Sequence, residues 1–142
     1  MRRPTVTRYK AAVQTETSLH MQVEKFLRVA WPSDDLPYTH FPAGEKRDDR
    51  VGGKLKRMGL KPGWPDFQLA LPNGQFAFIE LKKDHPDATL SGVQIDLRQK
   101  LVALKCGYAI CRSVEDVDVA ITRWLAAFKL KPRATLVRRN AA

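Results

Sequence analysis

The chain has 142 residues, the usual size of a single domain, so we expect one hydrophobic core. Hydrophobic residues make up 44% of the sequence and charged residues 28%, as in folded proteins. No apolar run approaches the roughly 20 residues that span a bilayer, which argues against a membrane-spanning protein. The formal charge of +10 indicates a preference for polyanionic partners and carries no information about the fold.

The N-terminal stretch MRRPTVTRYKAAVQ is basic but lacks the apolar segment of a secretory signal, so we expect residues 1–14 to form a loose basic arm. The two cysteines, Cys106 and Cys111, do not have the spacing of a metal-ligand pair, and the three histidines are scattered. These features argue against a zinc site and predict free thiols in a reducing cytoplasm.

The first half of the chain contains one clear amphipathic helix. Apolar residues recur at helical spacing over residues 15–31, and Pro32 ends the pattern. A short strand is expected at residues 38–43. In the segment 45–61, two adjacent glycines interrupt any long helix, so we expect part loop and part short helix there.

The second half alternates strands and helices. Strands are predicted at 67–71 and 75–82, joined by a Pro-Asn-Gly turn, and another at 108–113. Helices are predicted at 91–107 and 114–130. The residues expected to face inward from the first of these helices are Val93, Leu97, Leu101 and Leu104.

The unbroken apolar run in 75–82 is typical of a central strand that helices cover on both faces. Together with the helix and the strand that follow, it forms one β-α-β unit with parallel strands, whereas its hairpin partner is antiparallel. The pattern therefore predicts an α/β fold: a mixed β-sheet flanked by helices, in a single domain over residues 15–130. Residues 131–142 are predicted to form a basic C-terminal tail.

Positive charge is concentrated in two stretches. Residues 45–61 contain seven Lys or Arg and three acids, and residues 129–142 contain five and no acid. Such clusters suit a nucleic acid, whose condensed counterions are released on binding. A solvated surface with a disordered basic tail is the alternative, and charge alone does not decide between them. The candidate DNA-binding residues are Lys46, Arg47, Arg50, Lys54, Lys56, Arg57 and Lys61.

Charged residues appear at the end of the apolar central strand. Glu80 and Lys82 point to the same face, because side chains alternate along a strand. Open α/β sheets bind ligands outside the carboxyl ends of their strands, and a carboxylate buried there needs a partner. A divalent cation would meet that need. A simple salt bridge between Glu80 and Lys82 is the alternative.

The hairpin register decides whether Asp66 joins this site. A two-residue Asn-Gly turn would set Asp66 opposite Leu81, on the wrong face. A three-residue loop at 72–74 would set it opposite Glu80, and the Pro-Asn-Gly sequence favours that loop because proline suits the first turn position and glycine the left-handed one. The sequence thus predicts two carboxylates and one ammonium within reach of a single Mg²⁺.

These residues also carry a resemblance. Pro65-Asp66 followed by Glu80-Leu81-Lys82 resembles the PD-(D/E)XK nuclease motif. The wider pattern GLKPGWPD, FIELK and LSGVQ is similar to that of the virus-type replication-repair nuclease (VRR-NUC) branch, over roughly residues 15–125. The resemblance implies a restriction-endonuclease-like sheet and a nuclease that depends on a divalent metal ion, Mg²⁺ or Mn²⁺.

The resemblance implies roles for four residues of the central hairpin. Asp66 and Glu80 are similar to the family's metal-binding carboxylates, and the carbonyl group of Leu81 to a further metal ligand. Lys82 is similar to the residue that orients the attacking water or stabilises developing charge.

Two helical residues extend the resemblance. Gln94 is similar to the helix glutamine that lines the family's site, and Glu16 to an acid of the N-terminal helix that binds metal. A solvated glutamine and an acid that favours a helix N-terminus are the alternatives. The sequence departs from the family pattern at His20, where glutamine is usual, and at Ala43 and Glu45 in the basic loop.

The function that the resemblance implies is endonucleolytic hydrolysis of DNA, with branched DNA such as a Holliday junction as substrate and a homodimer as the active form. A role in phage or prophage DNA repair or recombination fits this activity. The rival interpretation is a non-catalytic nucleic-acid-binding module with a nuclease-like fold, which the presence of Asp66, Glu80 and Lys82 disfavours. An RNA-directed nuclease stays open.

Overall fold

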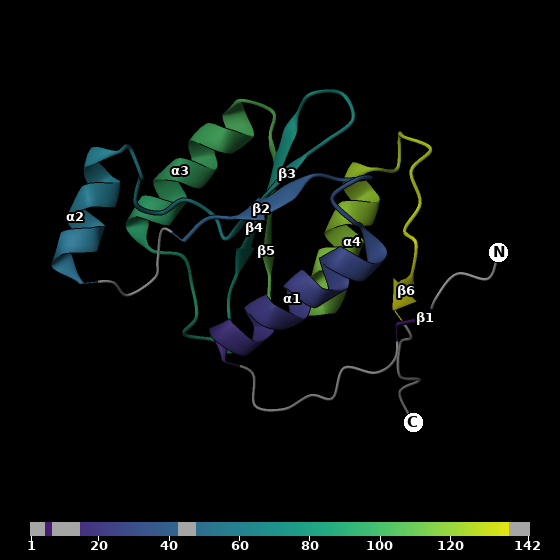
Figure 1. Cartoon of the computed structure of the whole chain (residues 1–142), viewed down its shortest axis with the longest axis horizontal. Coiled ribbons are helices and arrows are strands. Elements are labelled where there is room, and N and C mark those ends of the chain that lie inside the picture. Colours follow the sequence, from purple (N-terminus) through teal and green to yellow (C-terminus); the bar gives the residue numbers. More distant parts are fainter. Residues whose placement is uncertain (1–4, 7–14, 43–47, 137–142) are drawn as a thin grey trace.

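The computed structural model describes residues 5–6, 15–42 and 48–136 (Figure 1). The elements in chain order are β1 (Thr5–Val6), α1 (Glu16–Ala30), β2 (Tyr38–His40), α2 (Asp49–Arg57), β3 (Phe67–Ala70), β4 (Phe76–Leu81), α3 (Gly92–Ala103), β5 (Gly107–Cys111), α4 (Val114–Trp124) and β6 (Thr135–Leu136).

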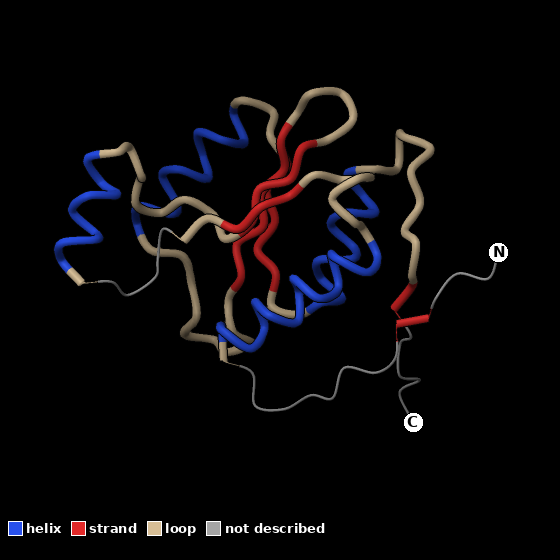
Figure 2. The backbone as a smooth tube through the Cα atoms, viewed as in Figure 1, coloured by secondary structure: helices blue, strands red, loops and turns tan. Residues whose placement is uncertain are grey.

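The main sheet has the strand order β2-β3-β4-β5. β4 and β5 are parallel and are joined through α3, whereas the β2–β3 and β3–β4 pairs are antiparallel. The strands cross the middle of the molecule, with α3 on one side and α1 and α4 on the other (Figure 2). The predicted mixed sheet and β-α-β unit are therefore confirmed.

The hydrophobic core lies between the sheet and the helices α1 and α4. Alternate strand residues point to this face, among them Phe67, Ile79 and Leu81, and each is at most 3% exposed. The helices contribute apolar residues at helical spacing, and these are fully buried: Leu19, Val23, Phe26 and Leu27 from α1, and Val117 and Ile121 from α4. α4 ends earlier than predicted, at Trp124, but Leu125 still packs in the core.

The helix α3 covers the opposite face, and the prediction for its inward residues is partly wrong. Leu101 is buried, but Val93 is 50% exposed and Leu104 75%. Gln94 and Leu101 are about two turns apart and share one side of the helix. Because the Gln94 side chain is bonded to the central strand, this side faces the sheet, and Val93 and Leu104 turn outward.

Some residues beyond the sheet also pack on the body of the protein. β1 pairs in parallel with β6, with Thr5 opposite Thr135. Ala134 is 1% exposed, and Arg133 forms an ion pair with Asp35 at 2.7 Å. Within the described residues, no helix is long and apolar enough to cross a membrane.

Candidate metal and active site

The β3–β4 hairpin has the predicted register. Phe67 lies opposite Ile79, so Asp66 and Glu80 are opposite each other at the next position. The backbone N–H of Leu71 donates to the carbonyl oxygen of Gln75 at 2.8 Å, which closes a three-residue loop. The last residue of that loop, Gly74, has φ 79°, the left-handed conformation that glycine adopts readily. Two acids of neighbouring strands are thereby brought to one end of the sheet.

The carboxylate of Asp66 is held against the central strand. Its Oδ2 accepts a hydrogen bond from the backbone N–H of Leu81 at 2.7 Å. Burial raises the pKa of Asp66, and the hydrogen bond from Leu81 opposes that rise. The backbone of Asp66 is also fixed, since its carbonyl oxygen accepts from the N–H of Phe41 and lies 3.0 Å from Nδ1 of His40.

Glu80 is only 4% exposed, although it carries a carboxyl group. The Nε2 of Gln94 donates to its Oε1 at 2.7 Å, and the Nζ of Lys82 lies 3.5 Å from the same oxygen. Burial and the charge of Asp66 raise the pKa of Glu80 to about 7, while Lys82 lowers it. A buried carboxyl group with this pKa is a common feature of functional sites.

The side chain of Gln94 is oriented by the start of α3. The hydroxyl of Ser91 accepts from the Gln94 backbone N–H, and the Ser91 N–H donates to Oε1 of Gln94, which forms a capping box. With Oε1 engaged in this way, Nε2 points at Glu80. The glutamine therefore connects the helix terminus to the candidate metal carboxylate, as the resemblance implies.

The loop before Asp66 packs tightly on this helix terminus through Gly63. This glycine has φ 77°, and a Cβ atom added to it would lie 2.8 Å from Cγ1 of Val93 and 3.3 Å from the backbone nitrogen of Gln94. Any side chain would therefore push the loop away from α3. The glycine of the Gly-Trp-Pro-Asp sequence thus keeps Asp66 and Gln94 in one site.

A cavity of about 860 Å³ opens at this end of the sheet. Six of its lining residues are those predicted for the catalytic and metal site: Glu16, Asp66, Glu80, Leu81, Lys82 and Gln94. The helix α1 supplies Glu16, whose charge contributes to the raised pKa of Glu80. The fold therefore brings all six to one place.

Two histidines of the cavity were not assigned a role from sequence. The ring of His20 stacks on that of Phe67, with 4.6 Å between the ring centroids. The rings of His20 and His40 meet edge to face, with 4.3 Å between their centroids. His40 in turn contacts the Asp66 carbonyl oxygen. The spacing of His20 one turn after Glu16 is the sequence signal for its position.

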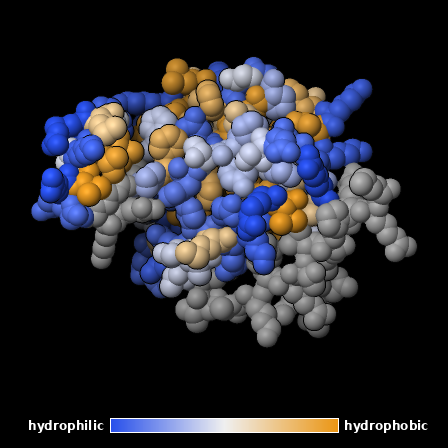
Figure 3. Space-filling view, viewed as in Figure 1, coloured by the Kyte–Doolittle hydropathy of each residue, from blue (hydrophilic) through white to orange (hydrophobic). Residues whose placement is uncertain are grey.

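The predicted DNA-binding residues that the structure describes do not line the cavity. Arg50, Lys54, Lys56 and Arg57 are on α2 and are exposed, as is Lys61, whereas Lys46 and Arg47 fall outside the described residues. α2 lies at the outer edge of the molecule, beyond α3 (Figure 1). In the space-filling view, most of the surface over α2 is hydrophilic, broken by a few hydrophobic side chains (Figure 3).

The donors at the site suit a hard divalent cation. Across the described ranges, no three His, Cys, Asp or Glu side chains gather closely enough to hold a metal ion alone. Mg²⁺, however, is usually bound by one or two carboxylates together with water and substrate phosphates. Glu80 is a buried and Asp66 a half-buried carboxyl group, and the charge of Asp66 helps to raise the pKa of Glu80, so the pair fits such a cation.

Comparison with known proteins supports the fold. No protein-family model and no curated protein matches the chain. A solved structure named "VRR_NUC domain protein" superposes with a TM-score of 0.60 over 83% of this chain and 92% of that one, at 20% sequence identity. The chain has the VRR-NUC fold. The α/β class and the resemblance noted in the sequence are confirmed, and in this VRR-NUC fold the hairpin β3–β4 carries Asp66 and Glu80.

Proposed function

We propose that the chain is a metal-dependent DNA endonuclease. The observation that carries this proposal is the pair of carboxyl groups, buried Glu80 and half-buried Asp66, opposite each other on neighbouring strands of a nuclease fold, with Lys82 and Gln94 beside them. We take residues 15–130 as the nuclease domain, with basic segments at 1–14 and 131–142, of which Arg133 and Ala134 pack on the domain.

The metal ion would be Mg²⁺ or Mn²⁺, held by Asp66 and Glu80 together with the Leu81 carbonyl group and Glu16. Such an ion would lower the pKa of a bound water and polarise the scissile phosphate. The Leu81 N–H keeps one oxygen of Asp66 against the strand. Gln94 sets the orientation of the Glu80 carboxylate. Lys82, whose side chain is 13% exposed and whose Nζ lies 3.5 Å from Glu80, would orient the attacking water or stabilise the negative charge that develops.

The substrate we propose is branched DNA, bound through the phosphate backbone. The exposed basic residues of α2 contact phosphates, which position a protein without reading bases, so recognition depends on DNA shape. Because resolving a four-way junction needs two symmetric cuts, the active form is a homodimer. Cys106 and Cys111 are free thiols, which suits a cytoplasmic enzyme.

The test is cleavage of four labelled DNAs of related sequence: duplex, single strand, flap and four-way junction, each with Mg²⁺, Mn²⁺ or EDTA. We expect cutting with either metal and none with EDTA. Asp66→Asn should abolish cutting and retain DNA binding in EDTA, since binding depends on the separate basic helix. Mn²⁺ should raise the melting temperature of the wild type and leave that of Asp66→Asn unchanged.

A matched control is Asp87→Asn, which removes an acid that is 91% exposed in the loop after β4. This variant should cut like the wild type. A wild type that binds DNA and cuts none of the four substrates with any metal would be a non-catalytic binding module. Cutting that Asp66→Asn leaves intact would rule out the proposed site.

A further inference from the structure

The cavity that contains the carboxylates also has an apolar side. Met21, Phe41 and Trp64 line it together with Asp66 and Glu80. Met21 is 68% exposed, and the side chains of Phe41 and Trp64 are half-buried. Coordination of a metal ion and a phosphate uses oxygen and nitrogen donors and gains nothing from an apolar wall. These side chains therefore indicate an additional ligand group.

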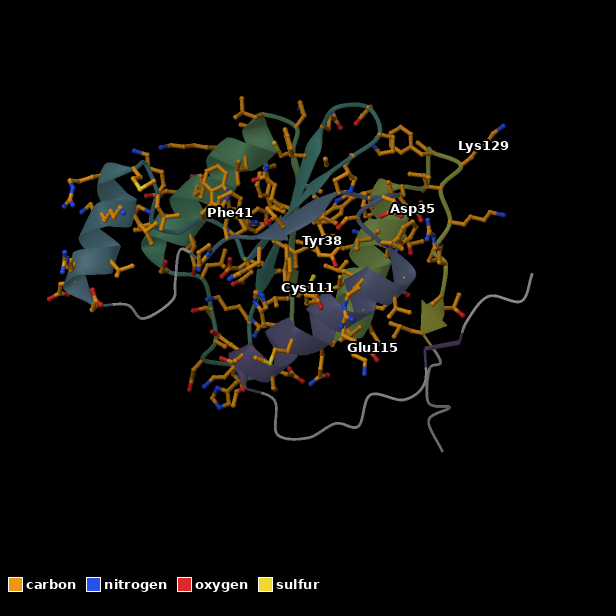
Figure 4. All side chains as sticks on the ribbon, in the orientation of Figure 1. Asp35, Tyr38, Phe41, Cys111, Glu115 and Lys129 are labelled. Atoms are coloured by element: carbon orange, nitrogen blue, oxygen red, sulfur yellow. The ribbon has the colours of Figure 1, made fainter. Side chains whose placement is uncertain are left out.

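The aromatic part of this wall is rigidly supported. The rings of Phe41 and Trp64 are 6.0 Å apart between centroids, and Trp64 meets Phe78 edge to face at 5.6 Å. Phe78 lies on β4 and is 3% exposed, so it anchors the ring of Trp64, which in turn supports that of Phe41. Figure 4 shows Phe41 beside α3, at the end of β2.

The aromatic wall is fixed relative to the reaction site. The backbone N–H of Phe41 donates to the carbonyl oxygen of Asp66 at 2.9 Å, so the residue after β2 is paired with the residue before β3. Asp66 is in turn opposite Glu80. A group that contacts the ring of Phe41 is thus held next to the phosphate that the carboxylates would bind through their metal ion.

The size of the cavity allows such a group. At about 860 Å³, it lies in the upper part of the range of about 300–1,000 Å³ that is typical of pockets for whole organic ligands. A metal ion with one phosphate fills a small part of that volume. A nucleobase attached to that phosphate is flat and aromatic, and its link to the phosphate keeps it close enough to occupy the remaining volume of the cavity.

We propose that the apolar side of the cavity, formed by Phe41, Trp64 and Met21, binds one unpaired nucleobase of DNA next to the scissile phosphate. This inference rests on the proposed nuclease function and adds one feature to its branched substrate: a nucleotide that is unpaired at the branch point, next to the cut. A base inside a duplex must be unstacked before it reaches the cavity, whereas an unpaired base enters without that cost. Exposed Met21 is suited to insert beside the last base pair, as apolar wedges do.

The test compares two DNAs of the same sequence: a fully paired duplex, and that duplex with one extra unpaired 2-aminopurine in one strand. Binding is measured by fluorescence anisotropy in Ca²⁺, and stacking by quenching of the 2-aminopurine emission. The wild type should bind the bulged DNA roughly tenfold more tightly, the usual effect of one base stacked on an aromatic side chain. Phe41→Leu should remove this preference and the quenching, and should leave duplex affinity unchanged.

Two further variants complete the test. Phe41→Trp keeps an aromatic face and should retain both the preference and the quenching. Phe76→Ala, which removes a phenyl ring that is 43% exposed at the opposite end of β4, should behave like the wild type. Equal affinity of the wild type for the two DNAs, or equal loss on both with Phe41→Leu, would overturn the inference. Cleavage with Mg²⁺ is scored separately, so active protein without a base preference refutes the inference alone.

Discussion

Glu80 shows how the site controls a single proton. It is almost fully buried, and burial together with Asp66 raises its pKa to about 7 from the usual 4.5. Because a metal ligand must be deprotonated, metal binding at this site should release protons below neutral pH and become stronger as the pH rises. The same carboxyl group should also make the stability of the metal-free protein depend on pH.

The direction of this pH dependence follows from proton binding. A carboxyl group with a raised pKa in the folded state holds its proton longer there than in the unfolded state, so the free energy of unfolding falls as the pH rises from about 4.5 through about 7. Glu80→Gln removes this titration and keeps an oxygen that accepts from Gln94. In EDTA, the variant should be more stable than the wild type at pH 8, by up to about 3 kcal/mol, and nearly equal at pH 4.5.

Urea unfolding at both pH values measures this difference. Glu115→Gln serves as the control, because Glu115 is an exposed acid on α4 and should show no such gain at pH 8. A wild type that is more stable than Glu80→Gln at pH 8 in EDTA would contradict the raised pKa.

The residues of the site differ in how well sequence predicts them. Asp66, Glu80 and Lys82 can be predicted from the sequence, because charges at the end of an apolar strand are unusual. Strand alternation and the turn sequence then determine which face of the sheet each side chain occupies. Phe41 and Trp64 could not be placed beside the site: a short strand predicted at 38–43 does not show which strand Phe41 lies next to, and Trp64 lies in a loop that has no periodic pattern. Their position beside the site depends on how β2 and the loop before β3 fold onto the sheet.

At the scale of elements, the hairpin was predictable and α3 was not. The Pro-Asn-Gly loop admits one favourable register, and the structure has it. The sequence of α3 has apolar residues on several sides, so its pattern does not define one inward face. Its rotation is set by the hydrogen bond from Gln94 to Glu80 and by the close packing on Gly63, two long-range contacts that local sequence does not encode.

The helix α2 is the element that should dominate DNA affinity. All residues of α2 are described, and none of them is buried, so its side chains contribute little to the hydrophobic core and are free to contact a ligand. Lys54, Lys56 and Arg57 are exposed on its last turns. Replacing these three by alanine should leave folding stability nearly unchanged, and should weaken binding to all DNA sequences alike because phosphate contacts carry no base information.

The measurement is the dependence of log K on log[salt] for duplex DNA. Four or five phosphate contacts give a slope of about −4, and each lost contact should reduce it by about 1, so the triple variant should approach about −1. Alanine replacement of three exposed basic residues on other segments, Lys25, Arg28 and Arg123, is the matched control and should keep the wild-type slope. An unchanged slope in the α2 variant would assign its charge to solubility.

At the scale of the whole molecule, the apolar surface on α3 bears on assembly. The large side chains of β2, and those at and just after the end of α4, are partly used within the chain: Tyr38 donates a hydrogen bond to Glu24, and Trp124 and Phe128 pack against the core. The helix α3, by contrast, exposes Val93, Ile95, Val102 and Leu104, by 50%, 43%, 48% and 75% respectively. A helix that is apolar on several sides is usually buried, which favours α3 as the contact between two copies.

We therefore expect a homodimer through α3. The double variant Val102→Asp with Leu104→Asp places two charges at the C-terminal end of the helix, far along it from Gln94, so the site should stay intact while like charges meet across a two-fold interface. Light scattering should report twice the chain mass for the wild type and the chain mass for the variant. Val119→Asp, at a residue of α4 that is 44% exposed, should stay dimeric. On a four-way junction, the dimer should make paired nicks in opposite strands and the monomeric variant single ones. A monomeric wild type would leave the metal nuclease in place and remove the junction-resolving assignment.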